Sequence, residues 1–210
     1  MSDKLTALSF ATADDSEELA RAELYGLLAR LWMAAPDEAL LDQIKVAVTQ
    51  APQEGAFLEG PWSALVAAMR TTTVKEASAE YDALFQGVGK PEVFLYGSYY
   101  LSGFLNERPL AVLRDELASL GLARDETRGE TEDHISAVCE VMRYLIAGDD
   151  VAVCNLERQR RFFRAHLQPW AEKLCDAVQA HPKAKLYREL AELTRAFVQV
   201  ETQGFDLLEQ

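Results

Sequence analysis

Apolar residues recur at helical spacing through most of the chain, and this pattern limits the possible folds more than any other feature. The clearest example lies near the C-terminus, where steps of four and three residues place five side chains on one helical stripe: Leu186, Leu190, Leu193, Phe197 and Val200. Another apolar face runs through 156–174, where Pro169 marks a break or a new helix start. Comparable patterns predict further helices in 15–32, 36–48, 61–70, 74–85 and 109–122.

Alternating strand patterns with hairpin turns are missing from the sequence. The pattern therefore predicts an all-α fold, a bundle of about eight to ten helices. The main irregular segments are 87–98 and 121–131. We expect one helical domain over 1–210, with a linker near 121–131 and a possible subdivision into 1–120 and 132–210. The linker is read as an ordinary interhelical loop or as a hinge, and the sequence alone favours the loop.

The charge balance narrows the classes of partner. The chain has 210 residues, with 21 basic against 34 acidic side chains and a net charge of −13. A basic footprint is expected of general nucleic-acid binders, so we expect no nucleic-acid partner. The acidity is compatible with a basic partner, such as an Arg-rich peptide, and with simple solubility.

The expected compartment follows from the apolar runs and the N-terminal sequence. No apolar run approaches the ~20 residues that a membrane-spanning helix needs, so we expect no stable membrane insertion. Residues 1–18 lack a basic head followed by a sustained apolar core, so we expect a cytoplasmic protein. The three cysteines, Cys139, Cys154 and Cys175, form no CxxC pair and are interpreted as small core side chains.

The segment GETEDHISAV (129–138) carries four ionisable side chains within five residues: Glu130, Glu132, Asp133 and His134. Thr131 could cap a helix there, and acids in a first turn complement the positive helix end. An apolar stripe follows at Ile135, Val138, Met142 and Leu145. A helix start explains Glu132 and Asp133. A protonated histidine would oppose the helix dipole, so we expect a neutral imidazole at His134 that binds a neighbouring backbone group or a ligand.

Catalytic and metal-binding interpretations of this segment are weaker. His166 and His181 have no partner at HxxxH or ExxH spacing, and no GxSxG motif is present. The segment GVGK (87–90) lacks the first glycine of a phosphate loop and has Pro91 in place of Ser or Thr. A helical metal-binding protein or enzyme using Glu130, Asp133 and His134 remains the alternative hypothesis, and a general helical interaction module is a third.

The aromatic stretch VFLYGSYYLSGFL (93–105) has two interpretations. It could be a loop and short helix that bury Phe94, Tyr96 and Phe104. It could equally be the wall of a binding groove, because tyrosine offers flat apolar area and a hydroxyl at low entropy cost. The residues alone do not choose between the two.

Four segments together resemble the TorD/DmsD/NarJ family of redox-enzyme maturation chaperones, particularly its TorD-like branch. The segment 81–89 (YDALFQGVG) is similar to the family's Y-x-x-L-F-x-G stretch. The segment 95–100 (LYGSYY) resembles P-Y-E-S-x-Y, with Leu95 for the proline and Gly97 for the glutamate. The segment 130–142 (ETEDHISAVCEVM) resembles E-x-x-D-H with its following helix, and 162–170 (FFRAHLQPW) resembles F-x-x-H-L-x-x-W.

The resemblance implies an all-helical cytoplasmic chaperone without catalytic activity. Members bind the precursor of a molybdoenzyme catalytic subunit, often through its twin-arginine leader peptide. They hold the precursor until molybdenum cofactor is inserted, and so delay its export. The resemblance implies no cofactor of the chaperone's own, although some members bind guanine nucleotide weakly. It is compatible with a monomer or a domain-swapped dimer, and it does not identify the client enzyme.

The expected client-binding residues combine this resemblance with side-chain chemistry. The family's D-H segment lies near the leader-binding surface, and carboxylates engage guanidinium groups well. Glu130 and Asp133 are therefore expected to meet the leader's arginines. Tyr96, Tyr100 and His134 are expected to line an apolar groove, and Ser98 matches the neighbouring motif. His134 either contacts the client or only supports the linker.

Overall fold

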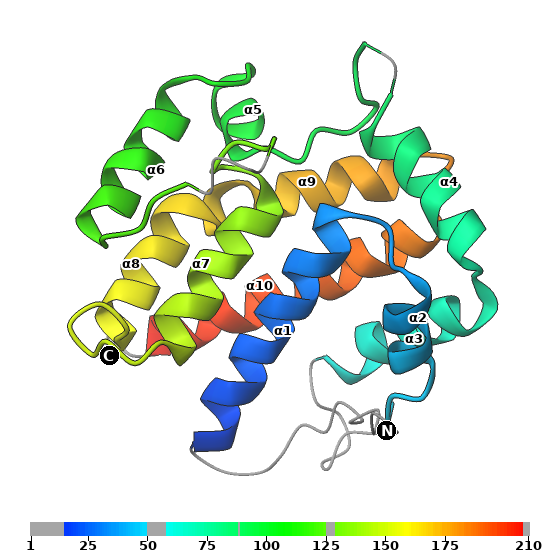
Figure 1. The fold of residues 1–210 in the computed structure, drawn as a ribbon, viewed down its shortest axis with the longest axis horizontal. Coiled ribbons are helices and arrows are strands. Elements are labelled where there is room, and N and C mark those ends of the chain that lie inside the picture. The colour runs from blue at the N-terminus through cyan, green and yellow to red at the C-terminus, as the bar shows by residue number, and fades with distance from the viewer. Residues whose placement is uncertain (1–14, 50–57, 88, 125–128, 208–210) are drawn as a thin grey trace, which may run out of the picture.

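The computed structural model describes residues 15–49, 58–87, 89–124 and 129–207. This part of the chain contains ten α-helices, in agreement with the expected all-α fold (Figure 1). Their bounds are α1 Asp15–Met33, α2 Glu38–Lys45, α3 Glu59–Thr71, α4 Val74–Phe85, α5 Gly97–Ser102, α6 Arg108–Ser119, α7 Ile135–Ala147, α8 Leu156–His166, α9 Gln168–Ala180 and α10 Leu186–Leu207.

The helices pack as a bundle around α1, α7 and α10. Helix α1 packs along α7, while α10 packs against α9 and α3. Figure 1 shows α1 and α7 side by side, with α10 passing behind them. The short helix α5 contacts α6 and α9, so it joins the outer helix α6 to the bundle.

Most helix ends follow the local signals expected from the sequence. Asp37 caps α2 by accepting a hydrogen bond from the Leu40 amide at 2.8 Å. Thr73 and Glu76 form a reciprocal capping box at the start of α4. Proline stands in the first turn of both α6 and α9.

Two boundaries around the linker differ from the prediction. Helix α5 begins at Gly97, within the segment expected to be irregular, and α7 begins at Ile135 instead of near Thr131. Thr131 caps no helix, because its hydroxyl donates to Asp133 Oδ1 at 2.6 Å. The helix begins late because 132–133 form a turn and His134 has extended backbone angles, and the Ile135 amide donates to the Leu95 carbonyl at 2.8 Å.

One hydrophobic core contains side chains from both sides of the linker. The Phe85 ring lies 5.9 Å from that of Trp32 and 5.0 Å from that of Tyr187, which connects α1, α4 and α10. The proposed subdivision into 1–120 and 132–210 stays a prediction. Part of the linker, 125–128, lies outside the described residues.

Two expectations about burial need correction. Cys139 and Cys175 are buried as expected, but Cys154 is half-exposed in the turn before α8, where its Sγ lies 3.3 Å from the Tyr144 carbonyl oxygen. Phe94 is buried, whereas Phe104 is 70% exposed. The chain turns at Gly103, which has a φ of 86°, and α5 ends there before Phe104 can reach the core.

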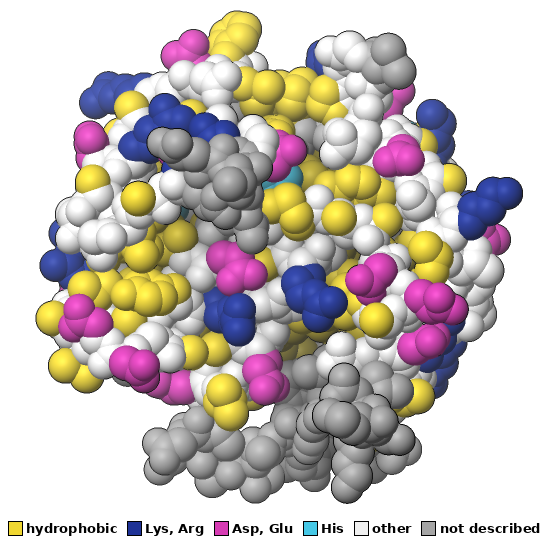
Figure 2. Space-filling view, viewed as in Figure 1, with side chains coloured by type: hydrophobic (Ala, Val, Ile, Leu, Met, Phe, Trp, Pro, Cys, Tyr) yellow, Lys and Arg dark blue, Asp and Glu magenta, His cyan; other side chains and the backbone are white. Residues whose placement is uncertain are grey.

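Charged and apolar side chains are interspersed over the surface drawn in Figure 2, with basic and acidic groups side by side. In the described part of the chain, no helix combines the length and apolar character required to cross a bilayer. The expectation that residues 1–18 form no signal peptide falls largely on 1–14, which lie outside the described residues.

Candidate functional site

The two motif segments expected to form the site lie directly against each other. Tyr96 and His134 form an isolated antiparallel bridge. The Gly97 amide donates to the Asp133 carbonyl at 2.9 Å, next to the Ile135–Leu95 hydrogen bond. We call residues 95–98 and 130–136 together the junction. It brings together five of the six predicted site residues, namely Tyr96, Ser98, Glu130, Asp133 and His134.

Asp133 is enclosed within the junction, with 4% of its surface exposed. Its Oδ2 accepts a hydrogen bond from the Ser98 amide at 2.8 Å, and its Oδ1 accepts one from the Thr131 hydroxyl. Amides at the start of a helix lack acceptors within the helix. Asp133 provides such an acceptor for the Ser98 amide of α5, although it lies in a distant segment of the chain. The Asp133 carboxylate therefore has a structural role, because it holds the start of α5 against the segment before α7.

His134 is the N-cap of α7 and is also buried, with 2% of its surface exposed. Its Nδ1 accepts a hydrogen bond from the Ser136 amide at 3.2 Å, so the neutral ring carries its proton on Nε2. Burial lowers the pKa of His134 to about 4, although Glu130 and Asp133 act in the opposite direction. The expected neutral imidazole is thus favoured mainly by burial.

Tyr96 and Glu130 form the partly exposed side of the junction. The Tyr96 hydroxyl donates to Glu130 Oε2, and its ring meets the His134 ring edge-on at 5.2 Å. Burial, reinforced by Glu130, raises the pKa of Tyr96 and keeps the phenol protonated. Of the predicted carboxylates, Glu130 is the one whose side chain reaches the surface.

Tyr100, within α5, contacts other residues than this pair does. Its hydroxyl donates to the Phe94 carbonyl at 2.8 Å, and its ring stacks on Trp170 with centroids 5.9 Å apart. Trp170 also explains the glycine that replaces the motif's glutamate. A Cβ at Gly97 would lie 2.9 Å from the indole, too close for any side chain.

The Ser98 hydroxyl is buried and has no hydrogen-bond partner among the described residues. The backbone of Ser98, in contrast, is held by Asp133. The contribution of Ser98 to the junction therefore comes from its amide group.

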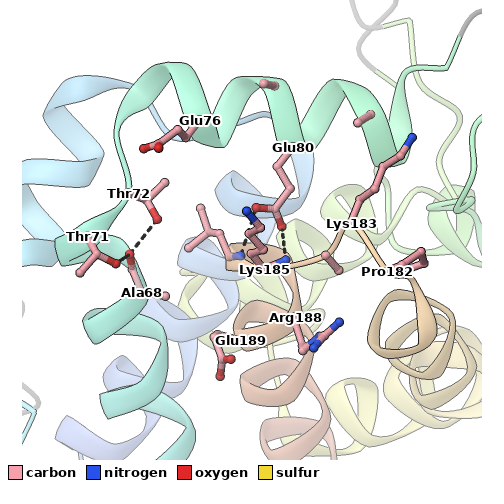
Figure 3. Close-up of a pocket in the computed structure, with 14 residues that line it drawn as sticks. Ala68, Thr71, Thr72, Glu76, Glu80, Pro182, Lys183, Lys185, Arg188 and Glu189 are labelled. Carbon is pink, nitrogen blue, oxygen red and sulfur yellow. Dashed lines mark hydrogen bonds between the residues drawn. The ribbon is translucent and has the colours of Figure 1, made fainter.

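Sequence reasoning missed a further carboxylate that accepts hydrogen bonds from amides at a helix start. Glu80 of α4 accepts hydrogen bonds from the amides of Lys185, Leu186 and Tyr187 at 2.7, 3.1 and 2.9 Å. These amides lie at the start of α10, and Figure 3 shows the Glu80 side chain directed toward the backbone near Lys185. Glu80, Lys185 and Leu186 line a cleft of about 870 Å³. More than a hundred positions separate the partners, so no local spacing rule reveals the contact.

No sequence pattern indicated the partly buried ion pair between α1 and α10. Arg21 donates to both carboxylate oxygens of Glu201 at 2.8 Å, and Tyr25 donates to the same carboxylate at 3.0 Å. Glu201 is 4% exposed. This pair fixes the first helix against the last.

The alternative hypothesis of a metal centre requires three or more converging ligands. Within the described ranges, no such group of histidine, cysteine, aspartate or glutamate side chains is present. Asp133 is already engaged by the Ser98 amide and by the Thr131 hydroxyl. His134 Nδ1 is occupied by the Ser136 amide.

The fold and the junction describe an all-helical protein in which the segment before α5 pairs with an acidic segment before α7. The chain belongs to the family described as nitrate reductase delta subunit, whose model matches residues 52–176. This match covers all four motif segments and the whole junction. The family resemblance predicted from the sequence is thereby confirmed.

Curated relatives agree with this assignment. The chain is 25% identical over 142 residues to the chaperone protein TorD from each of three strains of Vibrio cholerae serotype O1. Each alignment covers 64% of this chain and 64% of the relative. The chain thus spans just under two thirds of the length of these relatives.

Proposed function

We propose that this protein is a maturation chaperone for a molybdenum-cofactor oxidoreductase. It binds the precursor of the catalytic subunit in the cytoplasm, and its mechanism is reversible binding without bond making. Family membership and the relatives named chaperone protein TorD support this proposal. Binding assists cofactor insertion and delays export of the precursor.

The contact with the precursor is proposed to involve its twin-arginine leader. The observation that carries this proposal is the Tyr96–Glu130 pair at the partly exposed side of the junction. A carboxylate accepts two parallel hydrogen bonds from a guanidinium group, so Glu130 suits one arginine of the leader. The Tyr96 ring offers apolar area beside it, and the net charge of −13 favours the approach of a basic peptide.

The buried members of the junction are proposed to act as positioning residues. Asp133 and His134 each have an internal hydrogen bond to a backbone amide. They would hold the 95–98 and 130–136 segments in the geometry that presents Tyr96 and Glu130. In this proposal His134 supports the linker and does not touch the client.

Affinity capture from the native organism tests the proposed function. The tagged protein should retain a molybdoenzyme precursor that carries its leader, and the same precursor without its leader should be retained much less. The control is the Tyr96→Ala plus Glu130→Gln variant, whose fold is checked by circular dichroism. Equal capture of the precursor with and without its leader would contradict the proposed contact.

A further inference from the structure

A second candidate surface lies between the first turns of α1 and the C-terminal half of α10. These segments form a groove of 710 Å³. Its floor includes the buried side chains of Leu24, Phe197 and Phe205, and Leu156 at its edge is 42% exposed. The volume falls within the range of about 300–1,000 Å³ that is typical of binding pockets.

The polar groups in the floor are already satisfied by each other. Arg21 and Glu201 form their two-pronged ion pair there, and the Arg21 guanidinium lies 5.6 Å from the centroid of the Phe205 ring. A satisfied pair of this kind leaves little charge to attract a ligand. The floor therefore suits an apolar surface.

The rim of the groove is acidic. Glu17 and Glu18 line it and are exposed. Glu18 lies 3.8 Å from Arg21, which is committed to Glu201, and Glu17 has no ion-pair partner in the described part of the chain. The groove thus complements an apolar surface that carries positive charge at one edge.

Gly204 supplies an independent observation. Glycine within a helix is destabilising by roughly 0.5–1 kcal/mol relative to alanine. Gly204 lines the groove within α10, its φ is not positive, and an added Cβ would meet nothing within 4 Å. Neither the backbone nor the packing of this chain requires a glycine here. Its absence of a side chain leaves space for the close approach of another backbone.

We propose that this groove docks an amphipathic helical segment of a partner protein. The apolar face of that helix would lie on Phe197 and Phe205, its backbone would pass close to Gly204, and a lysine or arginine at one end would meet Glu17 and Glu18. This surface is separate from the junction. The inference therefore stands independently of the function proposed above.

A labelled synthetic helix tests this inference by fluorescence anisotropy. The probe has about 14 residues, hence a length of ~21 Å, with leucines along one face and two arginines at one end. A second peptide of the same composition has its leucines distributed around the helix. Measurement at about 0.15 M salt limits unspecific attraction to an acidic protein. The full chain should bind the first peptide at least about tenfold more tightly than the second.

Variants locate the binding. Gly204→Trp fills the groove and should weaken binding by about tenfold or more. Gly204→Ala should weaken binding by a smaller factor, because its methyl group occupies part of the space left for the partner backbone. Glu17→Lys plus Glu18→Lys should weaken binding similarly. Glu107→Lys plus Asp115→Lys makes the same change of net charge at two exposed positions, the N-cap of α6 and a residue within α6, and should have much less effect.

Several results would overturn the proposal. Equal affinity for the two peptides would contradict the proposal. Binding that neither Gly204→Trp nor the Glu17/Glu18 variant weakens would also contradict it. Binding seen only after deletion of residues 1–14 would assign the groove to the chain's own N-terminal segment. A dimer in sedimentation that Gly204→Trp dissociates would assign it to a second copy. Thermal unfolding of each variant establishes that it is folded.

Discussion

The Asp133 carboxylate accepts a hydrogen bond from the Ser98 amide at 2.8 Å, across 35 residues of sequence. Its own carbonyl also accepts one from the Gly97 amide. One residue thus fixes the first turn of α5 from the segment before α7. Glu80 does the same for α10, and these two carboxylates connect segments that lie far apart in the chain.

Replacing Asp133 by alanine should destabilise the protein. The Ser98 amide would lose its acceptor in a buried place, and an unsatisfied buried donor costs about 1–3 kcal/mol. Urea denaturation measures the loss. The matched control is Ser98→Ala, which removes a buried hydroxyl without a described partner and should leave the free energy of unfolding unchanged or slightly increased. An unchanged free energy of unfolding in the Asp133→Ala variant would contradict the role assigned to this carboxylate.

His134 should make stability depend on pH. Its pKa is lowered from 6.5 to about 4 in the folded protein. The unfolded chain therefore binds a proton first, and stability falls as pH decreases from about 6.5 to about 4. The expected loss between about pH 7 and pH 5 is about 2 kcal/mol.

The variant His134→Asn isolates this contribution, because asparagine caps helices but does not titrate in this range. Its free energy of unfolding should change less with pH than that of the wild type. His166, whose pKa is also lowered by burial, remains in both proteins and cancels in the comparison. Identical pH profiles would show that His134 is not held neutral by the fold.

Loss of the Glu80 carboxylate should loosen the start of α10. Glu80→Ala removes the acceptor of three amides, and the expected cost is about 1–3 kcal/mol in urea denaturation. Hydrogen exchange should locate the effect at 185–187. Glu23→Gln, which removes a charge from an exposed position of α1, serves as the control. Unchanged exchange at 185–187 would argue against this capping role.

Gly97 should not tolerate even one methyl group. A Cβ there would lie 2.9 Å from Trp170, and overpacking of this kind typically costs about 1–3 kcal/mol. Gly60→Ala is the matched control, because a Cβ at this helical position meets nothing within 4 Å and should stabilise α3. If both substitutions have the same effect on the unfolding midpoint, the close packing of Trp170 on Gly97 is wrong.

Much of the fold could be predicted because helix formation is encoded locally. The segment 74–85 coincides with α4, since its apolar spacing lies within the segment and its cap, Thr73, directly precedes it. The start of α7 was misplaced by several residues because it depends on a hydrogen bond to Leu95, some forty positions earlier. Local signals carry no information about such a partner.

The candidate site was predictable in composition but not in burial. The motifs indicated Tyr96, Ser98, Glu130, Asp133 and His134, and the junction brings them together. Their spacing did not show that Asp133 and His134 are enclosed while Glu130 reaches the surface. That difference arises from the pairing of two distant segments, as do the contacts of Glu80 and Arg21.

Calorimetric titration with a twin-arginine leader peptide tests the central claim most directly. The leader of a co-captured precursor should bind the wild-type protein, and Glu130→Gln or replacement of the two leader arginines by alanine should weaken binding by about tenfold or more. Combining both changes should add little further loss. No binding by the wild type, or binding indifferent to both changes, would contradict the account.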